Sequence, residues 1–250
     1  KELDVAARKC AEALGFPLVE IPEWQCCGAV YPMAADAIAE RLSAVRALVA
    51  ARENGGVLVT LCSACHHVIK RVNHDMAHNK DIQQKVNNYL RLDIPYAGET
   101  KVLRYLEVLR DVVGFDNLKA KVTNSLKGRK IAAYYGCLLL RPGQVMSFDD
   151  VERPVILEDF IKALGAEPVI YDMRNECCAG YMAVTDKSSC QQMVGEIQGS
   201  AANAGAGEFI TACPLCAYNL VANAGNDKLP VSYFTEVLAE ALGLNEGGAD

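Results

Sequence analysis

The sequence has no stretch of eighteen or more apolar residues, so it contains no candidate for a helix that crosses a bilayer. It also lacks a run of lysine and arginine. Its 25 basic side chains are outnumbered by 31 acidic ones, which argues against nucleic acid or an anionic membrane as a partner. Neither a GxGxxG turn nor a Walker A loop occurs, so we expect nicotinamide, flavin and nucleotide to bind elsewhere or not at all. The first ten residues have the pattern of an amphipathic helix rather than of a signal peptide, and we expect a soluble, cytoplasmic protein.

Cysteine is the residue in excess. The chain holds 11 cysteines among 250 residues, and they occur in clusters. Their odd number and the length of the chain argue against a secreted disulfide scaffold. Two clusters contain adjacent cysteines, QCCGA at 25–29 and ECCAG at 176–180, and neighbouring cysteines rarely bridge each other because the ring is strained. This pattern predicts metal sites.

The cysteine pattern occurs twice with one constant offset. Thirty-four residues separate Cys27 from Cys62 and also Cys178 from Cys213, and each later cysteine begins a CxxC motif. The flanking segments repeat as well, and the first half carries about twenty extra residues in or near the polar stretch 70–90. We therefore expect two pseudo-symmetric domains, 1–125 and 126–250. An offset of 151 relates the two sets of four: Cys26, Cys27, Cys62 and Cys65 to Cys177, Cys178, Cys213 and Cys216.

Within each half, short β-branched runs alternate with helical periods. Strands are predicted at 15–21 and 55–62 in the first half, and at 129–137, 167–173 and 208–213 in the second. Helices are predicted at 33–54, 63–72, 151–165 and 188–205. This alternation predicts an α/β fold in which each domain has a small parallel β-sheet flanked by helices. The cysteines then follow strands at the carboxyl edge of the sheets, and each CxxC pair begins a helix whose dipole stabilises thiolates.

One further cysteine completes the pattern in the second half only. Cys137 closes a strand forty residues before Cys177, which gives this half five motif cysteines, more than the four that zinc or a cubane cluster uses. The equivalent position in the first half would lie about fourteen residues before Lys1, so one ligand is unnamed. Cys10 and Cys190 lie outside the pattern, and we expect both to be buried core residues.

Residues beside the cysteines are weaker candidates. His66 and His67 follow the first CxxC motif, and we expect them to face solvent, although one of them could donate to a thiolate or a sulfide. Trp24 and Tyr135 lie beside cysteine positions and are expected to pack in the core.

The pattern C…CCG…CxxC, present twice, resembles the CCG-domain family, and nearly the whole chain looks like the B subunits of heterodisulfide reductases (HdrB) or their HdrB-like relatives. The resemblance implies two noncubane [4Fe-4S] clusters, each held by five cysteines and built from fused [3Fe–4S] and [2Fe–2S] units. It implies a disulfide substrate such as CoM-S-S-CoB, and electrons from a flavin subunit (HdrA-like) through a small ferredoxin-like iron–sulfur subunit (HdrC-like). The second pair departs from the pattern because it reads CCAG. We expect the glycine after each pair, Gly28 or Gly180, to let the backbone approach the cluster. The implied ligands are Cys26, Cys27, Cys62, Cys65, Cys137, Cys177, Cys178, Cys213 and Cys216.

Three classes of function stay open at this point. The first is a subunit that reduces or forms a disulfide. The second is an electron-transfer subunit of a quinone-linked 2-hydroxyacid dehydrogenase, or of another HdrB-like complex with a non-disulfide substrate, although such chains usually carry an additional ferredoxin-like segment that is absent here. The third is a structural module with tetrahedral zinc sites, and a mixed content of one iron–sulfur cluster plus zinc is a related alternative. The physiological substrate and the direction of the reaction are not indicated.

Overall fold

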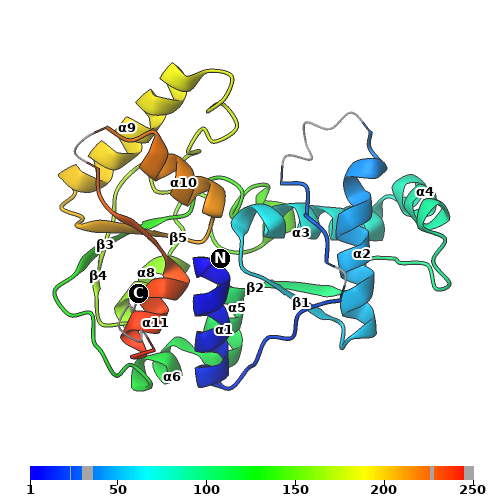
Figure 1. Ribbon diagram of the computed structural model, residues 1–250, viewed down its shortest axis with the longest axis horizontal. Coiled ribbons are helices and arrows are strands. Elements are labelled where there is room, and N and C mark those ends of the chain that lie inside the picture. Colours follow the sequence, from blue (N-terminus) through cyan, green and yellow to red (C-terminus); the bar gives the residue numbers. More distant parts are fainter. Residues whose placement is uncertain (23, 30–35, 226–227, 245–250) are drawn as a thin grey trace.

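The computed structural model describes residues 1–22, 24–29, 36–225 and 228–244. In the first half, two parallel strands pair in register from Val57 with Lys101 to Thr60 with Arg104, and helices pack around them (Figure 1). The elements of this half are α1 (Glu2–Leu14), α2 (Ala39–Glu53), β1 (Val57–Thr60), α3 (Ser63–His78), α4 (Lys80–Leu90), β2 (Lys101–Arg104), α5 (Tyr105–Val108), the π-helical turn η2 (Leu109–Val113) and α6 (Phe115–Ala120).

The second half contains a four-stranded sheet in the order β4-β3-β5-β6, and all its strand pairs are parallel. Small parallel sheets flanked by helices therefore occur in both halves, which confirms the expected α/β fold class. The elements of this half are β3 (Lys130–Tyr134), α7 (Gly143–Met146), α8 (Ile156–Ala163), β4 (Glu167–Val169), α9 (Lys187–Asn203), β5 (Glu208–Thr211), α10 (Pro214–Ala222), β6 (Val231–Tyr233) and α11 (Phe234–Ala241).

The repeat seen in the sequence is also a repeat of structure. Thr60 ends β1 opposite Arg104, and Thr211 ends β5 opposite Tyr233, so both halves use the same strand register. After β2 and β6 the chain enters a helix at once, and in both helices a glutamate in the first turn, Glu107 or Glu236, accepts a hydrogen bond from the backbone N–H of the preceding N-cap residue. The carboxyl ends of the strands are thus built alike in the two halves.

The predicted strand at 15–21 does not form. Gly15 ends α1 with a φ of +89°, and the residues after it are irregular up to position 21. The equivalent strand of the second half, β4, bonds only to β3, and the counterpart of β3 would precede Lys1. A strand needs a neighbour for its backbone groups, and this segment has none among the described residues. The predicted helix at 33–54 begins at Ala39, and its first three positions lie outside the described residues.

The largest hydrophobic core draws on both halves. Helix α1 packs against α11, and α8 packs against α6, so each half contributes a helix to the other. The ring of Phe160 lies 5.9 Å from that of Phe234, and Cys10 is fully buried in the same core with its sulfur 3.8 Å from the Thr235 carbonyl oxygen. Cys10 is therefore a core residue, as predicted. The domain boundary at 125/126 stays a prediction, and this core extends across it.

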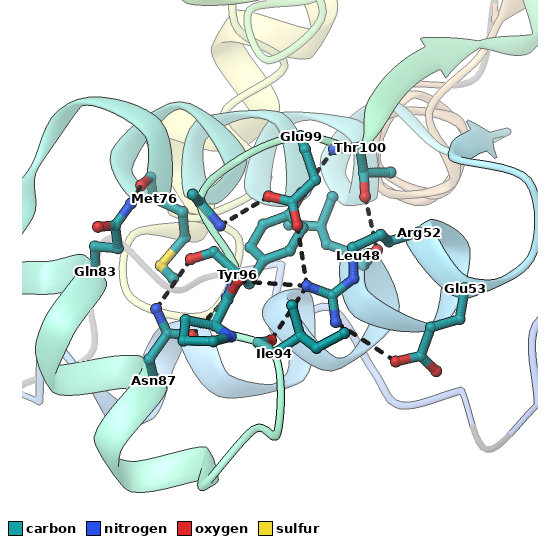
Figure 2. Close-up of polar contacts among 12 residues, drawn as sticks. Leu48, Arg52, Glu53, Met76, Gln83, Asn87, Ile94, Tyr96, Glu99 and Thr100 are labelled. Atoms are coloured by element: carbon teal, nitrogen blue, oxygen red, sulfur yellow. Dashed lines mark hydrogen bonds and ion pairs between the residues drawn. The ribbon is translucent and has the colours of Figure 1, made fainter.

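The extra residues of the first half form the end of α3 and the helix α4, which lies at the edge of the molecule far from the second half (Figure 1). Figure 2 shows how this region is fixed. The Asn87 side chain makes two hydrogen bonds with the backbone of Tyr96, and Arg52 pairs with Glu99 at 2.9 Å. These contacts join the insertion to α2 and to the segment before β2. Within the described residues, no helix is both long and apolar enough to cross a membrane.

Candidate metal centre

The two CxxC motifs begin helices whose first turns meet. Cys62 precedes α3 and Cys213 precedes α10, each directly after the end of a strand. Between them, the backbone N–H of Ser63 donates to the Ala212 carbonyl oxygen at 3.0 Å, and the Ser63 hydroxyl donates to the same oxygen at 3.1 Å. Ser63 is buried. The carboxyl ends of the two sheets therefore face each other across the pseudo-dyad.

Eight of the nine motif thiols either lie in sulfur–sulfur contact with another motif thiol or have their pKa shifted most strongly by one. Cys27 and Cys65 have their sulfurs 3.0 Å apart, and the equivalent pair of the second half, Cys178 and Cys216, is 3.6 Å apart. The thiols of Cys213, in the other half, and of Cys65, in its own motif, are the groups that most lower the pKa of Cys62, so the two groups adjoin there. In the same way Cys216 acts on the pKa of Cys213 and Cys137 on that of Cys177, while Cys26 is exposed.

The protonation states of the motif thiols depend on one another. Hydrogen bonds from Cys213 and Cys65 lower the pKa of Cys62 to about 3, and the bond from Cys65 lowers the pKa of Cys27 to about 7. The same bonds raise the pKa of Cys65, because losing its proton would place a second negative charge beside them. Likewise, the bond from Cys137 lowers the pKa of Cys177 to about 6. Complete deprotonation of this half-buried group therefore requires cations among the sulfurs.

An iron–sulfur cluster fits this donor set. Thiolates are its usual ligands, its irons supply the missing positive charge, and the motifs offer five thiols in the second half and four in the first. A single zinc ion takes four ligands and would leave one of the five thiols of the second half unused. The assignment of each cysteine as a ligand stays a proposal.

Backbone conformation around the sulfurs depends on small residues. Gly136 has a φ of +64°, and a side chain there would bring a carbon to within 3.2 Å of the Cys216 sulfur. Gly28 follows the first cysteine pair with a φ of +78°. Its equivalent in the second half is Ala179, with a φ of +58°, whereas Gly180 has no positive φ. The left-handed position of the second half thus falls on Ala179, and the expected role of Gly180 beside a cluster stays a prediction.

Replacing Ala179 with glycine is expected to stabilise the protein. An alanine in the left-handed region is strained by about 1–2 kcal/mol, and glycine relieves that strain. Glycine also raises the conformational entropy of the unfolded chain, which offsets part of the gain, so the net stabilisation is about 1 kcal/mol. Thermal unfolding under anaerobic conditions would measure it. The matched change, Gly28→Ala, should lower the melting temperature by a similar amount. Among the described residues no neighbouring atom lies within 4 Å of the added Cβ, so the change acts only through strain in the left-handed backbone. A destabilising Ala179→Gly change would contradict this interpretation.

Contacts with α10 hold the second cysteine pair. The Asn219 side chain donates to the Cys178 carbonyl oxygen and lies 3.4 Å from the sulfur of Cys190. Cys190 is fully buried, which confirms it as a core residue. The Tyr181 hydroxyl donates to the Ala29 carbonyl oxygen at 2.9 Å and so ties the loop after the second pair to the loop after the first.

Two predictions about neighbouring side chains are wrong. His66 and His67 are buried rather than solvent-facing, because the His66 ring lies against Thr60 of β1 and the His67 ring against the Leu138 carbonyl oxygen. Trp24 is 65% exposed, because it lies in an irregular segment outside both sheets. The prediction for Tyr135 is confirmed, since its ring is buried in the shared core.

The sequence patterns did not indicate Arg104. Its side chain is fully buried, and the thiols of Cys62 and Cys213 are among the groups whose charge it senses. The one signal in the sequence was a break in the repeat, because the equivalent position of the second half is Tyr233.

Comparison with known proteins agrees with this geometry. The family model described as "CCG: Cysteine-rich domain" matches residues 1–70 and 131–221, which together are more than half of the chain. The chain is 30% identical to the 8-methylmenaquinol:fumarate reductase membrane anchor subunit of Wolinella succinogenes, over 94% of this chain and 84% of that protein. It is 26% identical to the B subunit of the ferredoxin/F(420)H(2)-dependent CoB-CoM heterodisulfide reductase of Methanosarcina acetivorans, over 97% and 85%.

A third relative, a protein of Archaeoglobus profundus that is named as similar to the B subunits of heterodisulfide reductases, is 28% identical over 98% of this chain and 86% of its own length. Among solved structures, a hypothetical protein from Helicobacter pylori superposes with a TM-score of 0.77 at 12% identity, a likeness that concerns the fold alone. The superposition covers 98% of this chain and 46% of that protein. The resemblance inferred from the cysteine pattern is confirmed, and the chain belongs to the CCG, or cysteine-rich, domain family.

Proposed function

We propose that this chain is an iron–sulfur subunit of a reductase complex, in which two adjoining thiolate-bound clusters exchange electrons with partner subunits and with a substrate. The observation that carries the proposal is the pair of hydrogen bonds from Ser63 to the Ala212 carbonyl oxygen, which brings together Cys62 and Cys213, the first cysteines of the two CxxC motifs. The names of the relatives support it, since they are subunits of reductases.

The motif cysteines would hold two noncubane [4Fe-4S] clusters. Cys26, Cys27, Cys62 and Cys65 would bind the first, and Cys137, Cys177, Cys178, Cys213 and Cys216 the second. When bound, such clusters supply one-electron transfers at potentials that their surroundings set. The chain itself contributes the ordering of the thiols, since strand ends, helix starts and the Ser63 bonds fix their positions before any metal enters.

A disulfide is the substrate that we favour. Its cleavage requires two electrons and leaves two thiolates, and two electron-transfer groups that adjoin can deliver both electrons at one place. The relatives from Methanosarcina acetivorans and Archaeoglobus profundus carry the name of a heterodisulfide reductase B subunit or of a protein like it. We infer that the electrons arrive from the two partners that the family resemblance implies, a small ferredoxin-like iron–sulfur subunit and a flavin subunit.

A second candidate is electron transfer in a quinol-linked reductase without disulfide chemistry. The relative from Wolinella succinogenes favours it, because that protein is a subunit of a methylmenaquinol:fumarate reductase and is 30% identical to this chain. In this case the same two clusters would relay electrons between a quinol and a partner subunit.

Anaerobic turnover separates the two candidates. The iron-loaded protein would be mixed with dithionite and a panel of mixed alkyl disulfides, and released thiols would be counted. We expect two thiols per disulfide consumed, loss of the activity in Cys213→Ser, and its retention in Cys190→Ala, whose sulfur lies outside the motifs. If no disulfide releases thiol while a menaquinone analogue oxidises the reduced protein, the disulfide proposal is refuted and the quinol-linked candidate is supported.

A further inference from the structure

Arg104, the last residue of β2, is a fully buried arginine with two unused donors. Its Nη2 donates to the Leu61 carbonyl oxygen at 3.1 Å, and Leu61 directly precedes Cys62. In the described part of the chain, its Nε and Nη1 atoms find no hydrogen-bond partner. Leaving charged N–H groups buried without acceptors is costly, so this arrangement indicates that an acceptor belongs there.

The surroundings of Arg104 identify what kind of acceptor it is. The Glu107 carboxylate is engaged by the backbone N–H of Arg104 at 2.7 Å, as part of the helix cap. One side of the guanidinium is covered by Phe148, whose ring centre lies 5.8 Å away. Arginine keeps its proton at neutral pH, so this side chain is a buried cation, and the charges that interact with it are those of Cys62, Cys213, Glu107 and Cys65. The anionic groups left for it are the thiolates at the junction.

His66 does not compete with Arg104 as a hydrogen-bond donor to the sulfurs. The Thr60 hydroxyl donates its proton to the Leu103 carbonyl oxygen at 3.2 Å, so its lone pair accepts from His66 Nδ1–H at 2.8 Å. His66 Nε2 is then an acceptor, and it is buried without a partner among the described residues.

The repeat shows that Arg104 makes the two halves unequal. Arg104 pairs with Thr60 in the register that Tyr233 and Thr211 share in the second half. Tyr233 also lies near the junction, since Cys213 and Cys62 are among the charges that, after burial, raise its pKa. Both positions flank the same sulfurs, but the first half places a cation there and the second half a phenol.

We infer that Arg104 is the electrostatic partner of the thiolate-bound group of the first half, to which its free N–H groups donate and whose reduction its charge favours. This inference rests on the proposed function, because it presumes a redox cluster at each cysteine group. A fixed positive charge and hydrogen bonds to the sulfurs both stabilise the more negative, reduced state, so the first-half site should have the higher reduction potential. Arg104 is thus a positioning and tuning residue.

Redox titration of the iron-loaded protein, followed by EPR, tests the inference. In Arg104→Gln, which keeps an amide donor and loses the charge, we expect one of the two midpoint potentials to shift downward by more than the other. Arg104→Lys should keep both potentials near the wild-type values. The gain-of-charge variant Tyr233→Arg should shift the other potential upward. Iron per protein is measured in each variant, so that a shift is not confused with loss of metal.

Unchanged potentials in an iron-replete Arg104→Gln protein would overturn the role of Arg104. If Arg104→Gln does not fold, Tyr233→Arg decides, and unchanged potentials there would overturn it equally. Wild-type protein without two iron–sulfur signals would refute the proposed function instead, so the two failures are distinguishable.

Discussion

Replacing Cys213 with serine is expected to remove about half of the iron from the anaerobically purified protein, because Cys213 belongs to one of two thiolate groups and serine is a poor ligand for iron. Cys62→Ser should remove the iron of the other group, and the double variant nearly all of it. Iron and sulfide per protein, measured chemically, and the visible absorbance report the loss.

Two buried cysteines provide the control. Cys10 and Cys190 are fully buried like Cys213, but they bond to a backbone oxygen and to Asn219 and to no motif sulfur. Their alanine variants should keep full iron and the full spectrum. Full iron in Cys213→Ser, or loss of iron in Cys10→Ala, would contradict the division of the cysteines into ligands and core residues.

The second large effect is expected from Phe160→Ala. This ring is fully buried between Phe234 at 5.9 Å and Phe115 at 6.4 Å, and so joins α8 of the second half to α6 of the first. Removing a buried phenylalanine ring costs about 3–5 kcal/mol, which for a chain of this size lowers the melting temperature by about 10 °C. Because the core is shared, loss of helical circular dichroism and release of iron should occur in one transition.

Val184→Ala is the matched control for the truncation. This side chain is 95% exposed, so the melting temperature should stay within about 1 °C of the wild-type value. A drop as small as this in Phe160→Ala, or two separate transitions, would show that the halves are stabilised independently of the shared core.

The sequence predicted the cysteine-bearing elements well, because local signals and tertiary structure agree there. The run at 208–213 contains a short β-branched strand, and Pro214 then opens α10, a position where its missing N–H costs nothing. In the first half, β1 and α3 were predicted from the same pattern, a short β-branched run followed by a helical period. Constant spacing across the repeat identified which cysteines belong together, and the sulfur contacts Cys27–Cys65 and Cys178–Cys216 follow that mapping.

Features that depend on distant partners could not be predicted in this way. The run at 15–21 has strand-forming residues, but strand formation depends on a neighbour that no local pattern reveals. Burial of His66 and His67 depends on contacts with residues outside α3, Thr60 of β1 and Leu138 of the second half. The closeness of Cys62 and Cys213 depends on how the two halves pair in space, and the sequence repeat does not determine that pairing.

The most direct test of the central claim, that the two cysteine groups adjoin and each hold a cluster, is the EPR spectrum of the fully reduced, iron-loaded protein. Two adjoining paramagnetic clusters should give a spectrum split or broadened by spin–spin interaction, because such coupling requires short separation. Cys137→Ser, which removes a ligand of the second group only, should convert it to the simple spectrum of one isolated cluster. A wild-type spectrum that already shows a single isolated cluster, or two clusters without interaction, would contradict the account.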